Sequence, residues 1–390
     1  MSAVIVGYAR TPFMRFGGRF ASIPATELGA AAIRAALSRS GVPAEEVDFV
    51  YGGQVLQAGA GQNPARQSAV GAGIPLTVPA LTLNAVCLSG MEAVVAGARL
   101  IDAGDAEIVV AVGQESMSLA PHAWPGSRAG ARYGAIELLD TMEHDGLTDA
   151  FERRSMGAST EERNDALALT RVDQDAWAAS SHARLAASVD VQSGEIEPFT
   201  IEGRRGSTTV AADDGLRADT TVESLGSLRA AFGGSGTITA GNSSQITDGA
   251  AALVLMSEEA AAARGITGLA RILSHAFVAG PDVSLHAQPA RAIRAALAKT
   301  AHDVSALHAV EINEAFAAVA VHSTRELGID ESIVNTHGGA IALGHPIGAS
   351  GARIVGHLAR RLADGGAGAL GAAGICGGGG QGAAVVLQAM

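Results

Sequence analysis

Two cysteines occur in the 390 residues, and both lie in segments whose neighbours suit chemistry. Cys87 is separated by one residue from the Ser-Gly pair at 89–90 that opens a helical pattern, where free N–H groups and the helix dipole favour a thiolate. Cys376 lies in GICGGGGQG, where glycines can bring backbone N–H groups close to a ligand oxygen. The alternative for Cys87 is a buried thiol that packs as a small apolar side chain, and the alternative for Cys376 is an inert thiol in a flexible loop. Two cysteines cannot form a disulfide framework or a metal site built from CxxC pairs.

A histidine and an asparagine are further candidates. His345 is flanked by Gly344 and Pro346, which places it in a shaped turn rather than on a helix face. There it could be the base that activates Cys87, although a lone histidine is more often structural. Asn313 occurs in EINEAFAAVAV, after a strand-like segment and at the beginning of a helical one. From spacing alone, a helix cap is the better interpretation of Asn313.

The segments around these residues repeat along the chain. AIRAALSRSGVPAEEVDFV at 32–50 matches AIRAALAKTAHDVSALHAV at 292–310 with a constant spacing of 260 residues, and six consecutive identities open the match. Residues 89–113 match 350–374 with a spacing of 261 residues. Each copy has the pattern of an amphipathic helix followed by a strand. The agreement of the two spacings indicates an internal duplication.

The duplication relates the candidate residues to one another. The spacing of 261 residues places Cys87 opposite Gly348 and Asn84 opposite His345. If the two halves pack about a pseudo-twofold axis, these turns converge on one site. His345 is then predicted to meet Cys87 across the axis.

Helices alternate with strands that are too continuously apolar to have one wet face, such as IVVAVG at 108–113. This pattern is typical of α/β units whose sheets are covered on both sides. Residues 26–39 predict a helix, with Thr26 suited to capping its start. Between 119 and 240 the alternation weakens into a polar insertion with a helical stretch around 159–188. We expect this insertion to cover the site.

Composition limits the class of protein. Hydrophobic residues make up 48% and charged residues 17%, which is typical of a compact globule and, at this length, of two or three packed units. A net charge of −12 gives no global positive field for nucleic acid or an anionic membrane. The amino-terminal segment lacks the pattern of a signal peptide, and no long apolar run predicts membrane insertion. We expect a cytoplasmic protein.

Five motifs, in this order and at these separations, resemble those of the thiolases, and the similarity runs from about residue 3 to the carboxyl end. They are NAVCLSG at 84–90, GNSSQITDGAA at 241–251, INEAFA at 312–317, GGAIALGHPIGASGAR at 338–353 and CGGGGQG at 376–382. GQNPARQ at 61–67 and GQESMS at 113–118 fit the same pattern.

The resemblance implies a thiolase-type α/β fold, with two duplicated α/β halves in a layered αβαβα arrangement. Helices would lie between and outside two mixed sheets, with an inserted loop domain in the first half. The implied division is an N-terminal half at 1–118 plus 241–268, an inserted CoA-binding loop domain at 119–240, and a C-terminal half at 269–390.

The resemblance also implies roles for individual residues. Cys87 would be the acylated nucleophile, His345 its base and Cys376 the acid/base that moves a substrate proton. Asn313 would hold a water in an oxyanion site shared with His345. The N–H groups of Cys87 and Gly378 would form a second oxyanion hole for the acyl-enzyme carbonyl.

Substrate-binding residues are implied in the same way. Arg217 and Ser224 would bind the adenine end of CoA, and Ser244 would contact the pantetheine. Met156 and Phe316 match positions that line the acyl pocket, and Leu147 matches one beside the pantetheine arm; each of these three apolar residues could otherwise be core. CoA is expected as substrate and product, with no metal and no resident cofactor.

The sequence departs from the usual pattern of short-chain thiolases at four places. His337 stands where asparagine is usual, Ser155 where histidine is common, and Gln245 where a small glycine is frequent. LHAQPA at 285–290 replaces the usual GPxPA stretch. All four departures lie near the expected acyl and pantetheine region, so they bear on chain-length preference rather than on the reaction class.

The predicted function is reversible Claisen condensation of acetyl-CoA to acetoacetyl-CoA, or thiolysis of short 3-ketoacyl-CoA, through an acylated Cys87. One alternative is a broad-chain degradative 3-ketoacyl-CoA thiolase of fatty-acid β-oxidation, and a second is a noncatalytic acyl-CoA-binding relative. A decarboxylating or HMG-type condensing enzyme is disfavoured, because those relatives generally lack a cysteine at the position of Cys376. A homodimer or homotetramer is expected by resemblance only.

Overall fold

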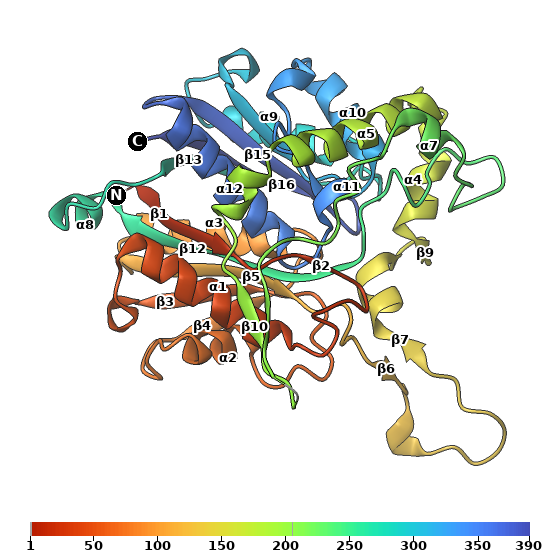
Figure 1. Cartoon of the computed structure of the whole chain (residues 1–390), viewed down its shortest axis with the longest axis horizontal. Helices are drawn as coiled ribbons and strands as arrows, with labels where there is room; N and C mark the ends of the chain where they lie inside the picture. The colour runs from red at the N-terminus through yellow and green to blue at the C-terminus, as the bar shows by residue number, and fades with distance from the viewer. Residues whose placement is uncertain (1, 205) are drawn as a thin grey trace.

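The computed structural model describes residues 2–204 and 206–390, and one large mixed sheet runs through it. This ten-stranded sheet has the order β14-β15-β16-β13-β1-β12-β5-β3-β4, with β2 paired to β12 (Figure 1). Its strands are β1 (Ala3–Arg10), β2 (Met14–Arg15), β3 (Phe49–Gly53), β4 (Ala80–Leu83), β5 (Ile108–Glu115), β12 (Thr247–Ser257), β13 (Ala270–Ala279), β14 (Ala309–Ile312), β15 (Leu370–Gly377) and β16 (Gln381–Ala389).

The strand order shows the duplication directly. The series β3-β5-β12-β1 in the first half is mirrored by β14-β15-β16-β13 in the second, and β4 is an addition to the first half. In each half the first two strands of the series pair in parallel, β3 with β5 and β14 with β15. The other neighbouring strands of each series pair antiparallel. The halves join through β1 and β13 at two residue pairs, Val4 with Arg271 and Ile5 with Ala270. The two predicted mixed sheets are therefore joined edge to edge into one.

The helices complete five layers. Their bounds are α1 (Ala25–Ser40), α2 (Pro64–Gly71), α3 (Ser89–Asp102), α8 (Glu258–Ala263), α9 (Gln288–Leu297), α10 (Ala317–Leu327), α11 (Ala340–Leu343) and α12 (Ser350–Gly365). Figure 1 shows α3 and α12 side by side between the two parts of the sheet, with α1 and α2 outside the first part and α9 and α10 outside the second. The predicted αβαβα arrangement is confirmed.

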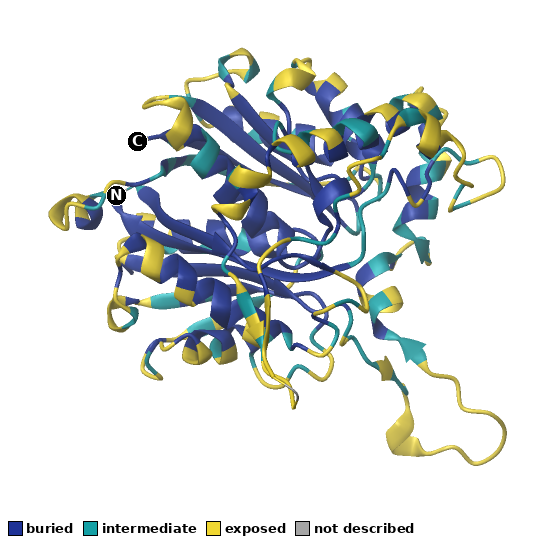
Figure 2. Cartoon of the chain, in the orientation of Figure 1, coloured by how far each residue is buried: buried dark blue, intermediate teal, exposed yellow. Residues whose placement is uncertain are grey.

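Burial follows the layers. Every residue of β1, β5, β12 and β15 is buried, as expected for strands covered on both faces (Figure 2). The central helices approach closely at their N-termini, because Gly90 and Gly351 have no side chain. A Cβ at Gly90 would lie 2.7 Å from the carbonyl oxygen of Gly348, and one at Gly351 would lie 2.4 Å from the nitrogen of Met91. The turns before α3 and α12 are thereby brought together.

Several predicted boundaries need correction. The first helix begins at Ala25, without a side-chain cap from Thr26. Asn313 is not a helix cap, because α10 begins at Ala317 with Phe316 as its N-cap residue. The stretch 159–188 forms two helices rather than one, and Thr170 makes a capping box for the second.

The match between the copies also shifts within the second repeat. Strands β5 and β15 both have eight residues and end at Glu115 and Gly377. Val109 pairs with Phe49, and Gly371 pairs with Ala309, the equivalent of Phe49. The strands are therefore related by 262 residues, one more than the helices before them, because α12 has 16 residues against 14 in α3 while the connection after it is one residue shorter.

Residues 119–240 form their elements outside the large sheet. Three small hairpins and four helices are present: β6 (His122–Ala123) with β7 (Leu139–Asp140), β8 (Thr148–Asp149) with β9 (Arg154–Ser155), β10 (Phe199–Ile201) with β11 (Thr208–Val210), α4 (Met156–Asn164), α5 (Arg171–Ala187), α6 (Val189–Ser193) and α7 (Val222–Gly226). Helix α5 packs on α10 and α11, and the segment between β6 and β7 projects from the molecule in Figure 1.

Short helical turns complete the described structure. Five are named: η1 (Ala44–Glu46), η2 (Ser127–Ala129), η3 (Met142–Leu147, a π-helix), η4 (Val304–Ala306) and η5 (Glu331–Ile333). In residues 2–204 and 206–390, none of the helices has both the length and the apolar character needed to cross a membrane.

Candidate active site

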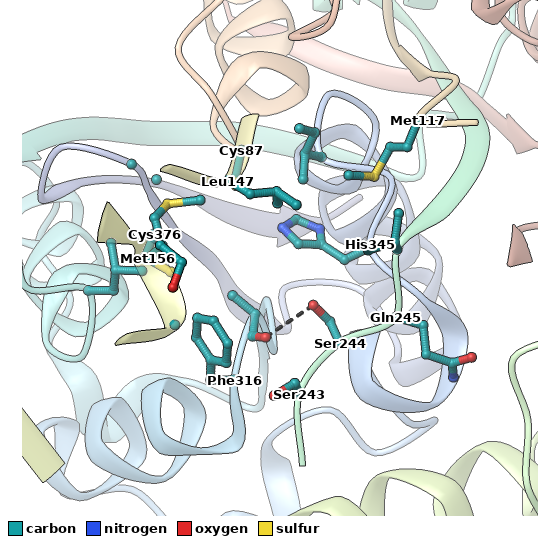
Figure 3. A pocket seen from close by; sticks show the side chains of 18 of the residues that line it. Cys87, Met117, Leu147, Met156, Ser243, Ser244, Gln245, Phe316, His345 and Cys376 are labelled. Atoms are coloured by element: carbon teal, nitrogen blue, oxygen red, sulfur yellow. Dashed lines mark hydrogen bonds between the residues drawn. The ribbon is translucent and has the colours of Figure 1, made fainter. Parts of the chain in front are cut away.

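Two turns and the end of a strand meet at a cavity of about 370 Å³. Cys87 lies in the turn between β4 and α3, His345 in the turn between α11 and α12, and Cys376 near the end of β15. All three side chains line the cavity, as Figure 3 shows. The prediction that the duplicated turns converge on one site is confirmed.

The turn that carries Cys87 is strained. Val86 has a φ of 53°, which is unusual for a β-branched residue and marks a locally over-determined backbone. The side chain of Asn84 accepts a hydrogen bond from the Val86 nitrogen at 3.0 Å. The Ser89 hydroxyl donates to the Val86 carbonyl at 2.6 Å and accepts from the Ala85 nitrogen at 2.9 Å. These bonds hold Cys87 in place against the cavity.

Both thiols are protonated in the resting site. Burial raises the pKa of Cys87, and the neighbouring Cys376 raises it further. Burial also raises the pKa of Cys376, to about 12. The expectation of a resting Cys87 thiolate from the helix N-terminus is therefore wrong, because loss of hydration outweighs the helix dipole. A base must take the Cys87 proton as the thiol attacks.

His345 has the protonation state that such a base needs. Burial, followed by the charge of Arg353, lowers the pKa of His345 to about 3, so the ring is neutral. The Ser350 hydroxyl lies 2.6 Å from His345 Nδ1 and donates to the Pro346 carbonyl at 3.0 Å. Because the Ser350 hydroxyl already donates its proton to Pro346, it accepts a hydrogen bond from His345 Nδ1–H. The other ring nitrogen, Nε2, therefore keeps its lone pair.

Asn313 lies beside this lone pair. Its Nδ2 is 3.4 Å from His345 Nε2, and both residues are buried. The Asn313 Oδ1 is buried and has no hydrogen-bond partner within the described residues. A buried acceptor of this kind costs free energy unless a water or ligand satisfies it. The structure thus brings Asn313 to His345.

The glycine run after Cys376 lets the chain turn sharply. Gly379 and Gly380 have φ values of 75° and 67°. A Cβ at Gly380 would lie 2.0 Å from the Asp282 carbonyl oxygen, so no side chain fits there. Gly378 lines the cavity. A Cβ at this position would lie 3.3 Å from the Met156 sulfur, which is a tight contact.

Four of the six predicted substrate-binding residues line the cavity, namely Ser244, Met156, Leu147 and Phe316. The Ser244 hydroxyl donates to the Ala315 carbonyl at 3.0 Å, the contact drawn in Figure 3. The other two lie outside the lining. Arg217 is exposed, and Ser224 is an exposed member of the Thr221 capping box at the start of α7.

The departures from the family pattern have different settings. Ser155 lines the cavity and caps α4 by accepting from the Ala158 nitrogen at 3.2 Å. Gln245 also lines it, and its amide donates to the carbonyls of Gly215 at 2.9 Å and Ile341 at 3.1 Å.

The other two departures differ in whether they reach the cavity. His337 contacts His357 at 3.2 Å, away from the cavity lining. In the LHAQPA segment, Leu285 lines the cavity, and buried His286 binds the Asn164 side chain at 2.9 Å.

Sequence reasoning missed several residues. Ser350 orients His345 and lies five residues after it, within a motif already singled out. Phe232, Met117 and Leu285 also line the cavity. Phe232 lies in no quoted motif, while Met117 and Leu285 lie in GQESMS and LHAQPA but received no role of their own. Large apolar residues such as these are indistinguishable from core until the fold places them.

Comparison with known proteins agrees with the fold. A family model described as the thiolase N-terminal domain matches residues 3–259, and one described as the thiolase C-terminal domain matches residues 266–389. Together these matches cover nearly the whole chain. The chain belongs to the thiolase family.

Individual relatives make the likeness more particular. The chain is 52% identical over 388 residues to a probable acetyl-CoA acetyltransferase of Mycolicibacterium smegmatis, covering 99% of this chain and 100% of that protein. It is 48% identical over 387 residues to an acetyl-CoA acetyltransferase of Pseudomonas aeruginosa, covering 98% of each. A protein of that name from Shinella zoogloeoides is 46% identical over 390 residues, covering 100% of this chain and 99% of its own.

Proposed function

We propose that the chain is an acetyl-CoA C-acetyltransferase, which joins two acetyl-CoA molecules into acetoacetyl-CoA and free CoA and catalyses the reverse thiolysis. The observation that carries the proposal is the meeting of Cys87, His345 and Cys376 at one cavity. The names of full-length relatives support the same substrate. Two thiols and a neutral imidazole are the groups that acyl transfer followed by carbon–carbon bond formation requires.

In the first half-reaction the Cys87 sulfur attacks the thioester carbonyl of acetyl-CoA while His345 Nε2 takes the thiol proton. The carbon–sulfur bond to CoA then breaks. CoA leaves as a thiol with the proton of Cys376, which leaves Cys376 as a thiolate and His345 as an imidazolium. This ion pair balances in charge, so neither cysteine has to be ionised in the empty site.

In the second half-reaction the Cys376 thiolate takes an α-proton from another acetyl-CoA. The enolate oxygen is stabilised by His345 Nε2–H and by a water held by Asn313. The enolate carbon attacks the acetyl-Cys87 carbonyl, and the bond from that carbon to Cys87 sulfur breaks. His345 returns its proton to Cys87, so all three groups recover their starting states.

The acyl-enzyme carbonyl needs its own hydrogen bonds. We assign these to the backbone N–H groups of Cys87 and Gly378, which lie on two of the converging turns. Preorganised donors of this kind are typically worth about 2.7 to 4 kcal/mol each when removed from an oxyanion hole. The glycine at 378 keeps the backbone free to approach the oxygen.

The walls of the cavity favour a short acyl group over the broad-chain alternative. Met156, Leu285 and Phe316 pack together with Cys376, and Phe232 stands edge-on to Phe316 with ring centroids 6.2 Å apart. Bulky apolar residues close to the second thiol limit the space for a long chain beside it. The degradative thiolase remains the outcome that the substrate test below would reveal.

The surroundings of the site complete the proposal. Ser244 contacts the pantetheine arm, while Arg217 and Ser224 hold the adenine end on the exposed insertion, where an arginine supplies the positive charge that the acidic protein lacks overall. CoA is a substrate, and no resident cofactor is required by the steps above. We place the enzyme in the cytoplasm.

We also propose a homodimer or homotetramer. Strand β4 is an open edge of the large sheet, and Leu81 on it is 47% exposed. The projecting segment of the insertion exposes Tyr133, Ile136 and Leu138. Unpaired edges and exposed apolar side chains are features that a second copy of the chain can cover.

The test is CoA-dependent cleavage of acetoacetyl-CoA, measured beside a medium-chain 3-ketoacyl-CoA. Preference for acetoacetyl-CoA is the expected result. Comparable cleavage of the longer substrate would identify a degradative thiolase instead. Absence of cleavage with both substrates, together with absence of an acetyl adduct on Cys87, would leave the noncatalytic alternative.

A further inference from the structure

Glu115, at the end of β5, is a fully buried carboxylate that the reaction steps do not use. Its Oε2 accepts hydrogen bonds from the nitrogens of Val55 at 3.1 Å and Gly348 at 2.9 Å, and its Oε1 accepts from Leu56 at 3.2 Å. It forms no ion pair within the described residues. One side chain thus connects the end of β5 to the loop after β3 and to the turn that carries His345.

These contacts reach both reacting groups. Gly348 is three residues from His345, and a Cβ there would lie 2.7 Å from Glu115 Oε2, so the turn rests directly on the carboxylate. On the other side, the Val55 carbonyl accepts a hydrogen bond from the Asn84 amide at 3.3 Å. Asn84 in turn holds the strained backbone next to Cys87. Glu115 is therefore joined to the turn of the base through Gly348, and to the turn of the nucleophile through Val55 and Asn84.

We propose that Glu115 is a positioning residue of the acyl-transfer reaction, whose ionised carboxylate sets the His345 turn against the Cys87 turn by accepting three backbone N–H groups. The inference rests on the proposed function, because it assigns a role within that reaction. A buried carboxylate without an ion pair is costly to ionise, so its presence here is better explained by geometry than by folding energy.

The charge state of Glu115 links this geometry to pH. Burial raises its pKa to about 7, against the three backbone hydrogen bonds that lower it; Asp248 on β12 raises it further, and the Cys87 thiol is the titratable group on the facing turn. Protonation would place an O–H donor among N–H donors. We expect the His345 turn to loosen as pH falls through about 7.

The experiment compares three variants of the full-length enzyme. Glu115→Gln keeps the shape and removes the charge, and Glu115→Asp keeps the charge on a shorter side chain. Glu92→Gln is the matched control, because Glu92 is a partly buried carboxylate on α3 whose pKa burial also raises and which has one unpartnered oxygen. Acetylation of Cys87 is followed by mass spectrometry, and thiolysis of acetoacetyl-CoA by steady-state kinetics from pH 5.5 to pH 9.

Glu115→Gln is expected to lower kcat by about 100-fold at pH 8 with KM changed less than about threefold, since misplacement by about 1 Å has effects of that size. Its acid limb near pH 7 should be absent, while Glu115→Asp should recover about tenfold over Glu115→Gln. Glu92→Gln should match the wild type.

A folded Glu115→Gln enzyme with kcat within twofold of the wild type, or with the same acid limb, would overturn the proposal. If that variant does not fold, Glu115→Asp decides, because unchanged kcat in it would equally exclude a positioning role. An inactive wild type would instead count against the proposed function, which keeps the two failures distinguishable.

Discussion

In each duplicated half, the end of one strand faces a turn of the other half, and we call each such contact a junction. Only one of the two junctions is open to the cavity. In the N-terminal half, β5 ends at Glu115, whose carboxylate fills the space beside Gly348. In the C-terminal half, β15 ends at Gly377, which lines the cavity beside Cys87, the counterpart of Gly348. A side chain closes one junction, and its absence opens the other.

This difference shows how a duplicated fold can hold a single active site. The open junction places Cys87 and Cys376 on a cavity, whereas the closed junction fixes the turn of His345 against the first half. One copy of the turn supplies the nucleophile and the other supplies the base. The predictions below test this division of labour, beginning with the largest expected effect.

Removing the nucleophile should abolish the reaction. Cys87→Ala is expected to lower turnover by about 10⁴-fold or more, because both half-reactions pass through its acyl thioester. Mass spectrometry after incubation with acetyl-CoA should show no acetyl adduct. A normal product rate would show that the open junction is not the reacting one.

Removing the second thiol should separate the two half-reactions. Cys376→Ala is expected to retain some acetylation of Cys87 but to lose condensation by about 10³-fold, the usual scale for loss of a general base. Adduct formation and acetoacetyl-CoA production are measured in the same samples. Equal loss of both activities would mean that Cys376 does not act as the separate base.

Filling the open junction should impair catalysis more mildly. A methyl group at position 377 would lie 2.7 Å from Leu88 Cγ, directly after Cys87, so Gly377→Ala must displace the nucleophile turn. We expect kcat to fall about tenfold through a small misplacement. Gly365→Ala is the control, because a Cβ there meets nothing within 4 Å. Unchanged kcat in Gly377→Ala would remove the contrast between the junctions.

The two titratable groups of the closed junction, His345 and Glu115, should contribute to stability with opposite dependence on pH. The pKa of His345 is lowered from 6.5 to about 3, so its contribution is present above pH 6.5 and is lost as pH falls toward 3. The pKa of Glu115 is raised from 4.5 to about 7, so its contribution is present below pH 4.5 and is lost as pH rises through 7.

Thermal melting at pH 5 and pH 7 tests the signs. The quantity compared is Tm at pH 7 minus Tm at pH 5. This difference should become smaller in His345→Asn, because the unfolded state no longer gains a proton at position 345 at the lower pH. The same difference should become larger in Glu115→Gln, because the variant loses a group that favours the folded state at pH 5 over pH 7. Changes of the reverse sign would show that these groups do not titrate as their burial indicates.

Much of this protein could be predicted from local patterns. Repeated helix and strand segments indicated the duplication, and the strand order of the sheet confirms it. Cys87, His345 and Cys376 were recognisable because each lies in a short turn or glycine-rich segment that a core residue does not need. Types, spacing and turn chemistry are encoded over a few residues and therefore survive in the sequence alone.

Long-range packing decided the rest. The resting state of Cys87 was mispredicted because a helix N-terminus is a local feature, whereas burial depends on the second half of the chain. Glu115 carried no local sign that it would bind a turn more than 230 residues away. Phe232 and Leu285 became cavity walls only through contacts between distant segments. Local sequence thus specifies which groups are available for chemistry. Their protonation, their neighbours and the junction that stays open depend on the tertiary structure, because desolvation and packing arise only when distant segments meet.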